Sequence, residues 1–208
     1  MEKPYASASA RNAAPILGVL RHELRGCTRV FEIGSGTGQH AVTFAAALPG
    51  ITWQTSDLVQ SHDGIRAWIE ESGLGNVLPP AEFDVLSARA PAAAYDAVFS
   101  ANTAHIMSYD EVRRMFALAG TMLRPRGIFC LYGPLSRGGR FSTASNETFD
   151  ASLRARNPAM GIRDLDDLDG LAGESGMDRE RLYAMPANNL LVVWARRENA
   201  MQVSPISD

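Results

Sequence analysis

A glycine-rich stretch lies among acidic residues that stand at the ends of successive hydrophobic runs. Residues 34–38, GSGTG, place glycine at alternate positions, and Glu32 lies two residues before the first of them. Asp57 and Asp84 stand near the ends of the next two runs. Glycine lets a ligand approach backbone amides closely, and open parallel sheets bind ligands at such turns on their carboxyl edge. We therefore expect Glu32 and Asp57 to face one shared cavity.

The spacing of the glycines argues against a phosphate ligand. Dinucleotide sites use GxGxxG, whereas Gly34, Gly36 and Gly38 follow the pattern GxGxG, and no lysine follows them as a phosphate loop requires. A carboxylate at Glu32 would repel a pyrophosphate, but it suits a ligand that carries an ammonium or sulfonium cation. The alternative is a turn that only reverses the chain.

The first two thirds of the chain alternate strand-length hydrophobic runs with longer segments of helical period. This order predicts a doubly wound, mostly parallel sheet with helices on both faces. The predicted strands are residues 28–34, 51–57, 77–85, 95–102 and 127–134, and the predicted helices are residues 40–50, 61–73 and 108–125. Pro125 and Gly127 are expected to close the last of these helices.

The final third predicts a loop, two helices and a hairpin. These segments are the loop 135–146, the helices 147–157 and 164–176, and the strands 179–186 and 188–197. A turn at Ala187 and Asn188 would make the two strands antiparallel at one sheet edge. Residues 7–24 predict a helix on the flank or ligand edge of the sheet, with one apolar face formed by Ile16, Leu17, Leu20 and Leu24.

Composition limits the class of protein. With 208 residues and 46% hydrophobic content, the chain suits a single domain, residues 1–208. Within it, residues 1–25 form an N-terminal helical cover and residues 135–178 an insertion of a lid loop and helices. The net charge of -3 disfavours nucleic acid as a partner. No membrane span, export signal or metal-ligand pattern is apparent, so we expect reduced thiols at Cys27 and Cys130 and a cytoplasmic protein without a metal.

The glycine motif and the strand ending in Asp57 resemble the S-adenosylmethionine (SAM) site of class I methyltransferases. More narrowly, the chain resembles DUF938, also called UPF0585, a family of methyltransferase-like proteins that includes relatives of methyltransferase-like 26. The shared segments include EIGSGTGQHAV, WQTSDL, DAVFSANTAHI, SNETFDASLRARNP and MPANNL, in this order along nearly the whole chain. The resemblance implies a Rossmann-like class I fold of seven strands, mostly parallel with the last antiparallel, and SAM as cofactor with S-adenosylhomocysteine (SAH) as product.

The resemblance also implies which residues bind the cofactor. Gly34, Ser35 and Gly36 would wrap its methionine part, with Glu32 directed towards the amino group or the turn. Asp57 would accept hydrogen bonds from both ribose hydroxyls, and Asp84 and Val85 would contact adenine. The further expected contacts are Ser100, Gln39, Arg11 and Asn12. Simpler roles compete with these, such as a helix cap for Asp57 and a surface turn for Asp84.

The methyl acceptor is expected at the ends of the fourth and fifth strands. Candidates for catalysis there are Asn102, His105 and Tyr132, and Thr103 is a further candidate beside them. His105 could act as a base near neutral pH, and Tyr132 could orient the acceptor or contact the sulfonium. A structural hydrogen bond for His105 and simple packing for Tyr132 are equally open.

Substrate-binding candidates come from the final third: Arg140, Asn146 and Asn188, together with Tyr132. Arginines in the glycine-rich loop could hold a carboxylate or phosphate of the acceptor, although a solvated loop is the commoner arrangement. We expect methylation of a small-molecule acceptor by a monomer or homodimer. The alternatives are a SAM- or SAH-binding sensor without turnover and a nicotinamide-dependent oxidoreductase, which fits the sheet but not the glycine spacing.

Overall fold

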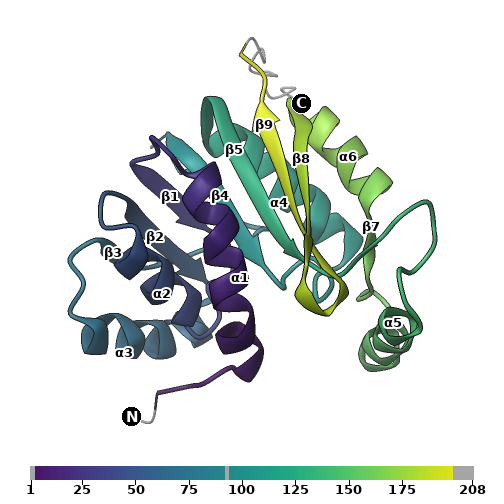
Figure 1. Ribbon diagram of the computed structural model, residues 1–208, viewed down its shortest axis with the longest axis horizontal. Helices are drawn as coiled ribbons and strands as arrows, with labels where there is room; N and C mark the ends of the chain where they lie inside the picture. The colour runs from purple at the N-terminus through teal and green to yellow at the C-terminus, as the bar shows by residue number, and fades with distance from the viewer. Residues whose placement is uncertain (1–2, 92–93, 199–208) are drawn as a thin grey trace.

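The computed structural model describes residues 3–91 and 94–198 (Figure 1), so the end of the expected 1–208 domain, residues 199–208, lies outside the described residues. The main sheet has seven strands in the order β3-β2-β1-β4-β5-β9-β8. They are β1 (Arg29–Glu32), β2 (Thr52–Asp57), β3 (Val77–Glu82), β4 (Tyr95–Ala101), β5 (Leu123–Gly133), β8 (Met177–Met185) and β9 (Asn189–Arg196). A separate pair consists of β6 (Leu135–Ser136) and β7 (Arg163–Asp164).

The strand directions confirm the predicted fold class. Strands β1 to β5 are mutually parallel wherever they pair. Strand β9 lies between β5 and β8 and is antiparallel to both, as the opposed arrows in Figure 1 show. The hairpin of β8 and β9 at the sheet edge was predicted, and its tip is the short turn η2 (Pro186–Asn188).

Helices cover both faces of the sheet. One face carries α1 (Ser7–Glu23) and α2 (Gln39–Ala47), with α3 (His62–Ser72) beside α2. The other face carries α4 (Tyr109–Met122) and α6 (Leu165–Glu174), and α5 (Ala144–Arg156) lies away from the sheet in Figure 1. Within the described ranges, no helix combines the length and the hydrophobicity that a membrane span requires.

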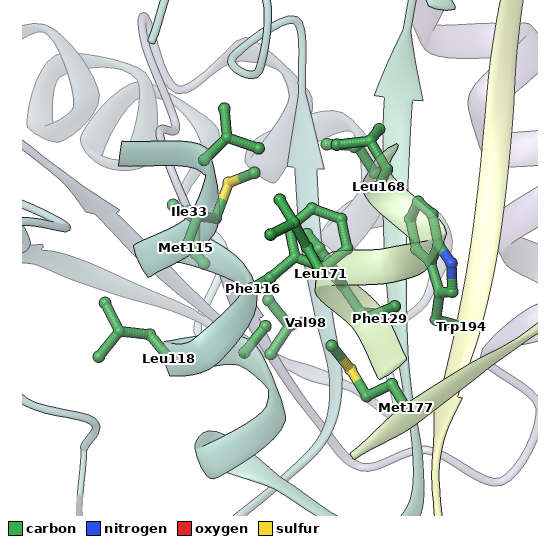
Figure 2. Packing of buried hydrophobic residues seen from close by; sticks show 14 of the residues in the cluster. Ile33, Val98, Met115, Phe116, Leu118, Phe129, Leu168, Leu171, Met177 and Trp194 are labelled. Atoms are coloured by element: carbon green, nitrogen blue, oxygen red, sulfur yellow. The ribbon is translucent and has the colours of Figure 1, made fainter. Parts of the chain in front are cut away.

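Aromatic side chains dominate both cores. Under α4 and α6, the ring of Phe116 lies 5.1 Å from those of Phe129 and Trp194, with Leu168 and Leu171 beside them (Figure 2). The other core contains Phe44, Trp53 and Phe99 together with Ile16, Leu20 and Leu24 of the N-terminal segment. Helix α1 therefore packs through its predicted apolar face, and it lies on the flank of the sheet.

The boundary between α4 and β5 differs from the prediction. The helix begins as a capping box, in which Ser108 accepts from the Glu111 amide, but it ends at Met122. Pro125 and Gly127 lie inside β5, so the expectation that they close the helix is wrong. The residue before a proline avoids the helical region, and Leu123 pairs with Tyr95, so the strand starts early.

The third strand is shorter than predicted. It ends at Glu82 rather than at Val85, and its Pro79 and Pro80 are tolerated because β3 is an edge strand. Asp84 and Val85 therefore lie in the loop beyond the sheet. This loop stands at the carboxyl edge, where the parallel strands also present the glycine turn and Asp57.

Candidate cofactor and acceptor site

The glycine turn after β1 is packed tightly against the chain around it. Gly34, Gly36 and Gly38 have φ values of +73°, +58° and +89°, which side-chain-bearing residues rarely adopt. A β-carbon on Gly34 would lie 2.7 Å from the Thr103 methyl carbon, and one on Gly38 would lie 3.1 Å from the Ile65 Cα. Glycine thus allows the loop after β4 and helix α3 to approach the turn.

Asp57 at the end of β2 fixes the turn through hydrogen bonds. One carboxylate oxygen accepts from the Gly36 amide at 2.7 Å, and the other accepts from the Leu58 amide at 2.8 Å. The Ser35 amide donates to the Ser56 carbonyl at 2.9 Å. Each carboxylate oxygen has two acceptor positions, so Asp57 retains capacity for a ligand's hydroxyl groups.

Glu32 lies behind this turn rather than in front of it. Its carboxylate is buried and accepts from the Ser35 hydroxyl at 2.9 Å and the Trp53 indole at 3.0 Å. Burial raises the pKa of Glu32 to about 7 in spite of these bonds. Glu32 does not line the cavity that Asp57 faces, so the structure does not bring the two acids together in a shared cavity, and the Glu32 side chain is directed towards the turn.

A cavity of about 790 Å³ opens over the turn at the carboxyl edge of the sheet. This volume lies within the range of small-molecule and cofactor sites. The predicted cofactor residues among its lining are Gly34, Ser35, Gly36, Asp57, Asp84 and Val85. Asn102 and Thr103, which were expected on the acceptor side, also line it, as does His40 at the start of α2.

Exposed apolar side chains surround the same cavity. Leu58, Leu86 and Ile106 are 41%, 59% and 48% exposed, and all three line it. The sequence prediction missed these residues. Each stands within a few positions of a strand end, and an apolar residue at such a position is a signal that could have identified them. A concave site with exposed apolar walls suits a ligand with a flat apolar part.

The N-terminal segment forms another wall. Pro4, Ala6 and Ser9 line the cavity. The Ala6 amide donates to the Gln39 side chain, and the Ser9 carbonyl lies 3.1 Å from Nε2 of His40. Gln39 therefore fixes the segment and does not line the cavity.

Arg11 and Asn12, the residues predicted to cover the cofactor, also do not line the cavity. They lie in α1, where Arg11 is exposed and Asn12 is half-buried. The part of the N-terminal segment that covers the site thus precedes the residues that the sequence indicated.

Ser100 also lies outside the cavity lining. Its side chain is buried and donates to the Ile33 carbonyl at 2.7 Å, with the Thr103 hydroxyl 2.7 Å away. It thereby joins β1 to the loop after β4. Asn102, next in the chain after β4, has φ +60° and donates its amide to the Tyr132 carbonyl at 2.9 Å.

Neither His105, the expected base, nor Tyr132, the residue expected to orient the acceptor, lines the cavity over the turn. His105 is 8% exposed and its ring lies 5.3 Å from that of Phe149. Burial, with Arg156 and Arg163 nearby, lowers the pKa of His105 to about 4. Tyr132 is 1% exposed, its hydroxyl accepts from Asn189 at 3.0 Å, and burial raises its pKa. The structure thus gives both residues packed surroundings.

A second cavity of about 450 Å³ lies between the loop after β5 and the β8–β9 hairpin. Two predicted substrate residues, Arg140 and Asn188, line it, whereas Asn146 is buried beside it. Asn146 donates to the Ser142 hydroxyl at 3.0 Å and to the Asn188 carbonyl at 3.3 Å. It therefore ties the start of α5 to the hairpin tip.

Comparison with solved structures defines the class of fold. An O-methyltransferase family protein from Burkholderia thailandensis is similar with a TM-score of 0.81 and 19% identity, over 92% of this chain and 58% of that one. Human N-acetylserotonin methyltransferase in complex with SAM gives a TM-score of 0.77 and 14% identity, over 91% and 53%. The chain thus has the fold of class I methyltransferases, and it spans just over half the length of these neighbours.

The particular family follows from the sequence. The family model described as "Protein of unknown function (DUF938)" matches residues 3–196. The chain therefore belongs to the DUF938 family, which the resemblance of its motifs predicted.

Proposed function

We propose that this protein is a SAM-dependent methyltransferase that methylates a small molecule. The observation that carries the proposal is the glycine turn, which Asp57 holds open at the floor of a cavity of about 790 Å³. The fold is that of methyltransferases, and the residues along the sheet edge would meet the methionine, ribose and adenine parts of SAM in that order.

The residues that line the cavity form three groups, one for each part of such a cofactor. Gly34, Ser35 and Gly36 would hold the methionine part, and Asp57 would accept from the ribose hydroxyls. The loop with Asp84 and Val85 would hold adenine, with Leu58, Leu86 and Ile106 as the exposed apolar walls. The Asp84 carboxylate already accepts from the Leu86 amide at 2.9 Å, which keeps it at the end of this loop.

Bound SAM supplies a methyl carbon that an acceptor atom can attack while the carbon–sulfur bond breaks, its electron pair staying on sulfur and any acceptor proton passing to water. The protein's part is then to position the reactants. His40, the one histidine among the described lining residues, contacts the Ser9 carbonyl, and burial lowers its pKa. We therefore propose catalysis by positioning, without a base from His105.

Ligand binding tests the cofactor. We expect SAM and SAH, but not NAD, to raise the melting temperature, since a ligand at about a hundred times its Kd stabilises by roughly 2.7 kcal/mol. Asp57→Asn should weaken SAH binding about tenfold, because it removes charge-assisted acceptors. Asp178→Asn, at an exposed pair with Arg197, is the matched control. Stabilisation by NAD alone, or unchanged affinity in Asp57→Asn, would refute the assignment.

Turnover separates the enzyme from the alternative, a SAM- or SAH-binding sensor. The sensor is favoured by the position of His105 and Tyr132 outside both cavities. We expect release of SAH from SAM when a panel of small molecules is supplied, and Asp57→Asn should reduce that release. Binding of SAM without SAH release from any member of the panel would favour the sensor.

A further inference from the structure

The second cavity has a charge pattern that the proposed cofactor does not use. Arg137 and Arg140 line it, and its described lining contains no acidic residue. Neither arginine forms an ion pair in the part of the chain that the structure describes, whereas Arg154, Arg179 and Arg197 each pair with a carboxylate within 3 Å. Both arginines are exposed, and the described lining of the cavity thus carries two positive charges and no negative one.

The backbone places the two arginines opposite each other. The amide of each donates to the carbonyl of the other, at 3.0 and 3.1 Å, across a turn of Gly138 and Gly139. Both glycines have left-handed φ values, +56° and +72°, as a two-residue hairpin requires. In such a pair the side chains share one face and the Cα atoms are about 5.5 Å apart. Like charges in this position repel each other, and a bound anion would relieve the repulsion.

The loop that carries these arginines is fixed from outside. The Asp164 carboxylate accepts from the Ser136 hydroxyl and from the Gly139 amide, both at 2.8 Å. The β6–β7 pairing of Leu135 with Arg163 holds the same loop. The arginine pair is thus presented by a supported turn, which reduces the entropy lost when a ligand binds.

The opposite wall of the cavity is the hairpin tip, and its backbone is also unusual. Ala187 and Asn188 have φ values of +57° and +59°, although neither is glycine. Strained backbone of this kind is concentrated at ligand sites. Asn188 and Asn189 line the cavity as polar groups, and Met185 and Leu190 give it an apolar side.

The two cavities stand at neighbouring strand ends of the same sheet edge, with buried Tyr132 between them. Asn102, which lines the larger one, donates its amide to Tyr132, and the Tyr132 hydroxyl accepts from Asn189, which lines the smaller one. Strands β4, β5 and β9 are consecutive in the sheet, so the ends at Asn102 and Leu190 are about 10 Å apart. A small molecule can span this distance.

We propose that the methyl acceptor is a small molecule with an oxyanion group, a carboxylate or a phosphate, that binds between Arg137 and Arg140. Planar guanidinium groups bind both oxyanions with paired hydrogen bonds. The apolar body of the acceptor lies against Phe141, Met185 and Leu190, and its methyl-accepting atom reaches the larger cavity at Asn102. This inference rests on the proposed function for its methyl donor.

Binding of simple probes to the full chain, with and without SAH, tests the anion site. The probes are 3-phenylpropionate, its neutral amide 3-phenylpropanamide, and phenyl phosphate, titrated by calorimetry or NMR. We expect at least one anionic probe to bind about tenfold or more tightly than the amide. The double variant Arg137→Gln/Arg140→Gln should lose that preference, and Arg25→Gln, an exposed arginine in the turn after α1, should keep it. Comparing the affinity of 3-phenylpropionate with that of phenyl phosphate shows whether the site prefers a carboxylate or a phosphate.

The outcomes distinguish the inference from the proposed function. Equal binding of the anions and the amide, no binding of either, or a preference that persists in the double variant overturns the inference. SAH binding in the same titrations then leaves the proposed function standing. If SAH fails to bind while the anion preference holds and depends on the arginines, the methyl donor is wrong and the anion site remains. An unchanged urea midpoint for the double variant shows that its fold is intact.

Discussion

Replacing Gly34 by alanine should break the contact between the glycine turn and the loop after β4. The new β-carbon would stand 2.7 Å from the methyl carbon of Thr103, so one of them must move by about 0.7 Å to reach an ordinary contact of 3.4 Å. The next nearest atom, the β-carbon of Thr103, is 3.9 Å away and causes no conflict. The clash therefore comes from a single methyl group, which Thr103→Ser removes while keeping the hydroxyl near Ser100.

The energies of the two single variants should not add. Alanine at φ +73° costs about 1 to 2 kcal/mol for the left-handed backbone, and the clash costs about 1 to 3 kcal/mol more. Thr103→Ser alone loses one buried methyl group, about 1 kcal/mol. In the double variant the alanine methyl occupies the space that serine leaves, so only the backbone cost remains. We expect a favourable coupling energy of about 2 to 4 kcal/mol, the clash together with the recovered methyl group.

Urea denaturation of the four proteins in this cycle measures the coupling. Calorimetric titration with SAH on the same proteins reports on the turn itself, and we expect Gly34→Ala to bind weakly and the double variant to recover part of the affinity. Additive free energies of unfolding would show that Thr103 does not limit the turn, and would refute the role assigned to the close packing at Gly34.

Further predictions concern buried titratable groups and helix contacts. Because the pKa of Glu32 is raised to about 7, the free energy of unfolding of the wild type should fall by about 3 kcal/mol as pH rises from 4.5 through 7. Glutamine does not titrate, so the stability of Glu32→Gln relative to the wild type, measured by urea unfolding, should rise by the same amount over this range. A difference that stays constant with pH would contradict this. The pKa of His105, lowered to about 4, predicts a flat NMR shift of its ring from pH 8 to 5.5, because the imidazole of the folded protein stays neutral over that range, and a midpoint near 6.5 would disprove its burial. Gly120→Ala should destabilise the protein by about 1 to 3 kcal/mol, because the new β-carbon would lie 2.3 Å from the Ser175 carbonyl oxygen. Gly170→Ala, whose β-carbon would have no atom within 4 Å, should stabilise the protein by up to about 1 kcal/mol. Similar unfolding midpoints for the two variants would contradict this.

The order of elements could be predicted because hydrophobic period and turn residues specify it locally. The secondary structure of residues that pair with distant parts of the chain could not be predicted in this way. Leu123 becomes a strand residue through its partner Tyr95, although Pro125 and Gly127 look locally like the end of a helix. The two-residue strands β6 and β7 are too short to carry any periodic pattern.

The candidate site was predicted in position but only partly in side-chain direction. Gly34, Asp57 and Asp84 were located because strand ends of a parallel sheet meet at one edge. Glu32 and Ser100 stand at the same edge, but successive strand residues face opposite sides, and their side chains satisfy buried partners instead. Whether a strand-end residue faces the ligand depends on where the strand stops, to within one residue, which the sequence does not specify.

The wall that residues 3–9 add to the larger cavity has a kinetic consequence. For a molecule that leaves past Pro4, Ala6 and Ser9, exit requires the Ala6 and Ser9 contacts to Gln39 and His40 to open. By that route, residence time depends on fraying at the start of α1 as well as on the strength of the glycine-turn contacts. Cleavage by a protease ahead of α1 should slow when the cavity is filled, so digestion rate becomes a direct measure of occupancy.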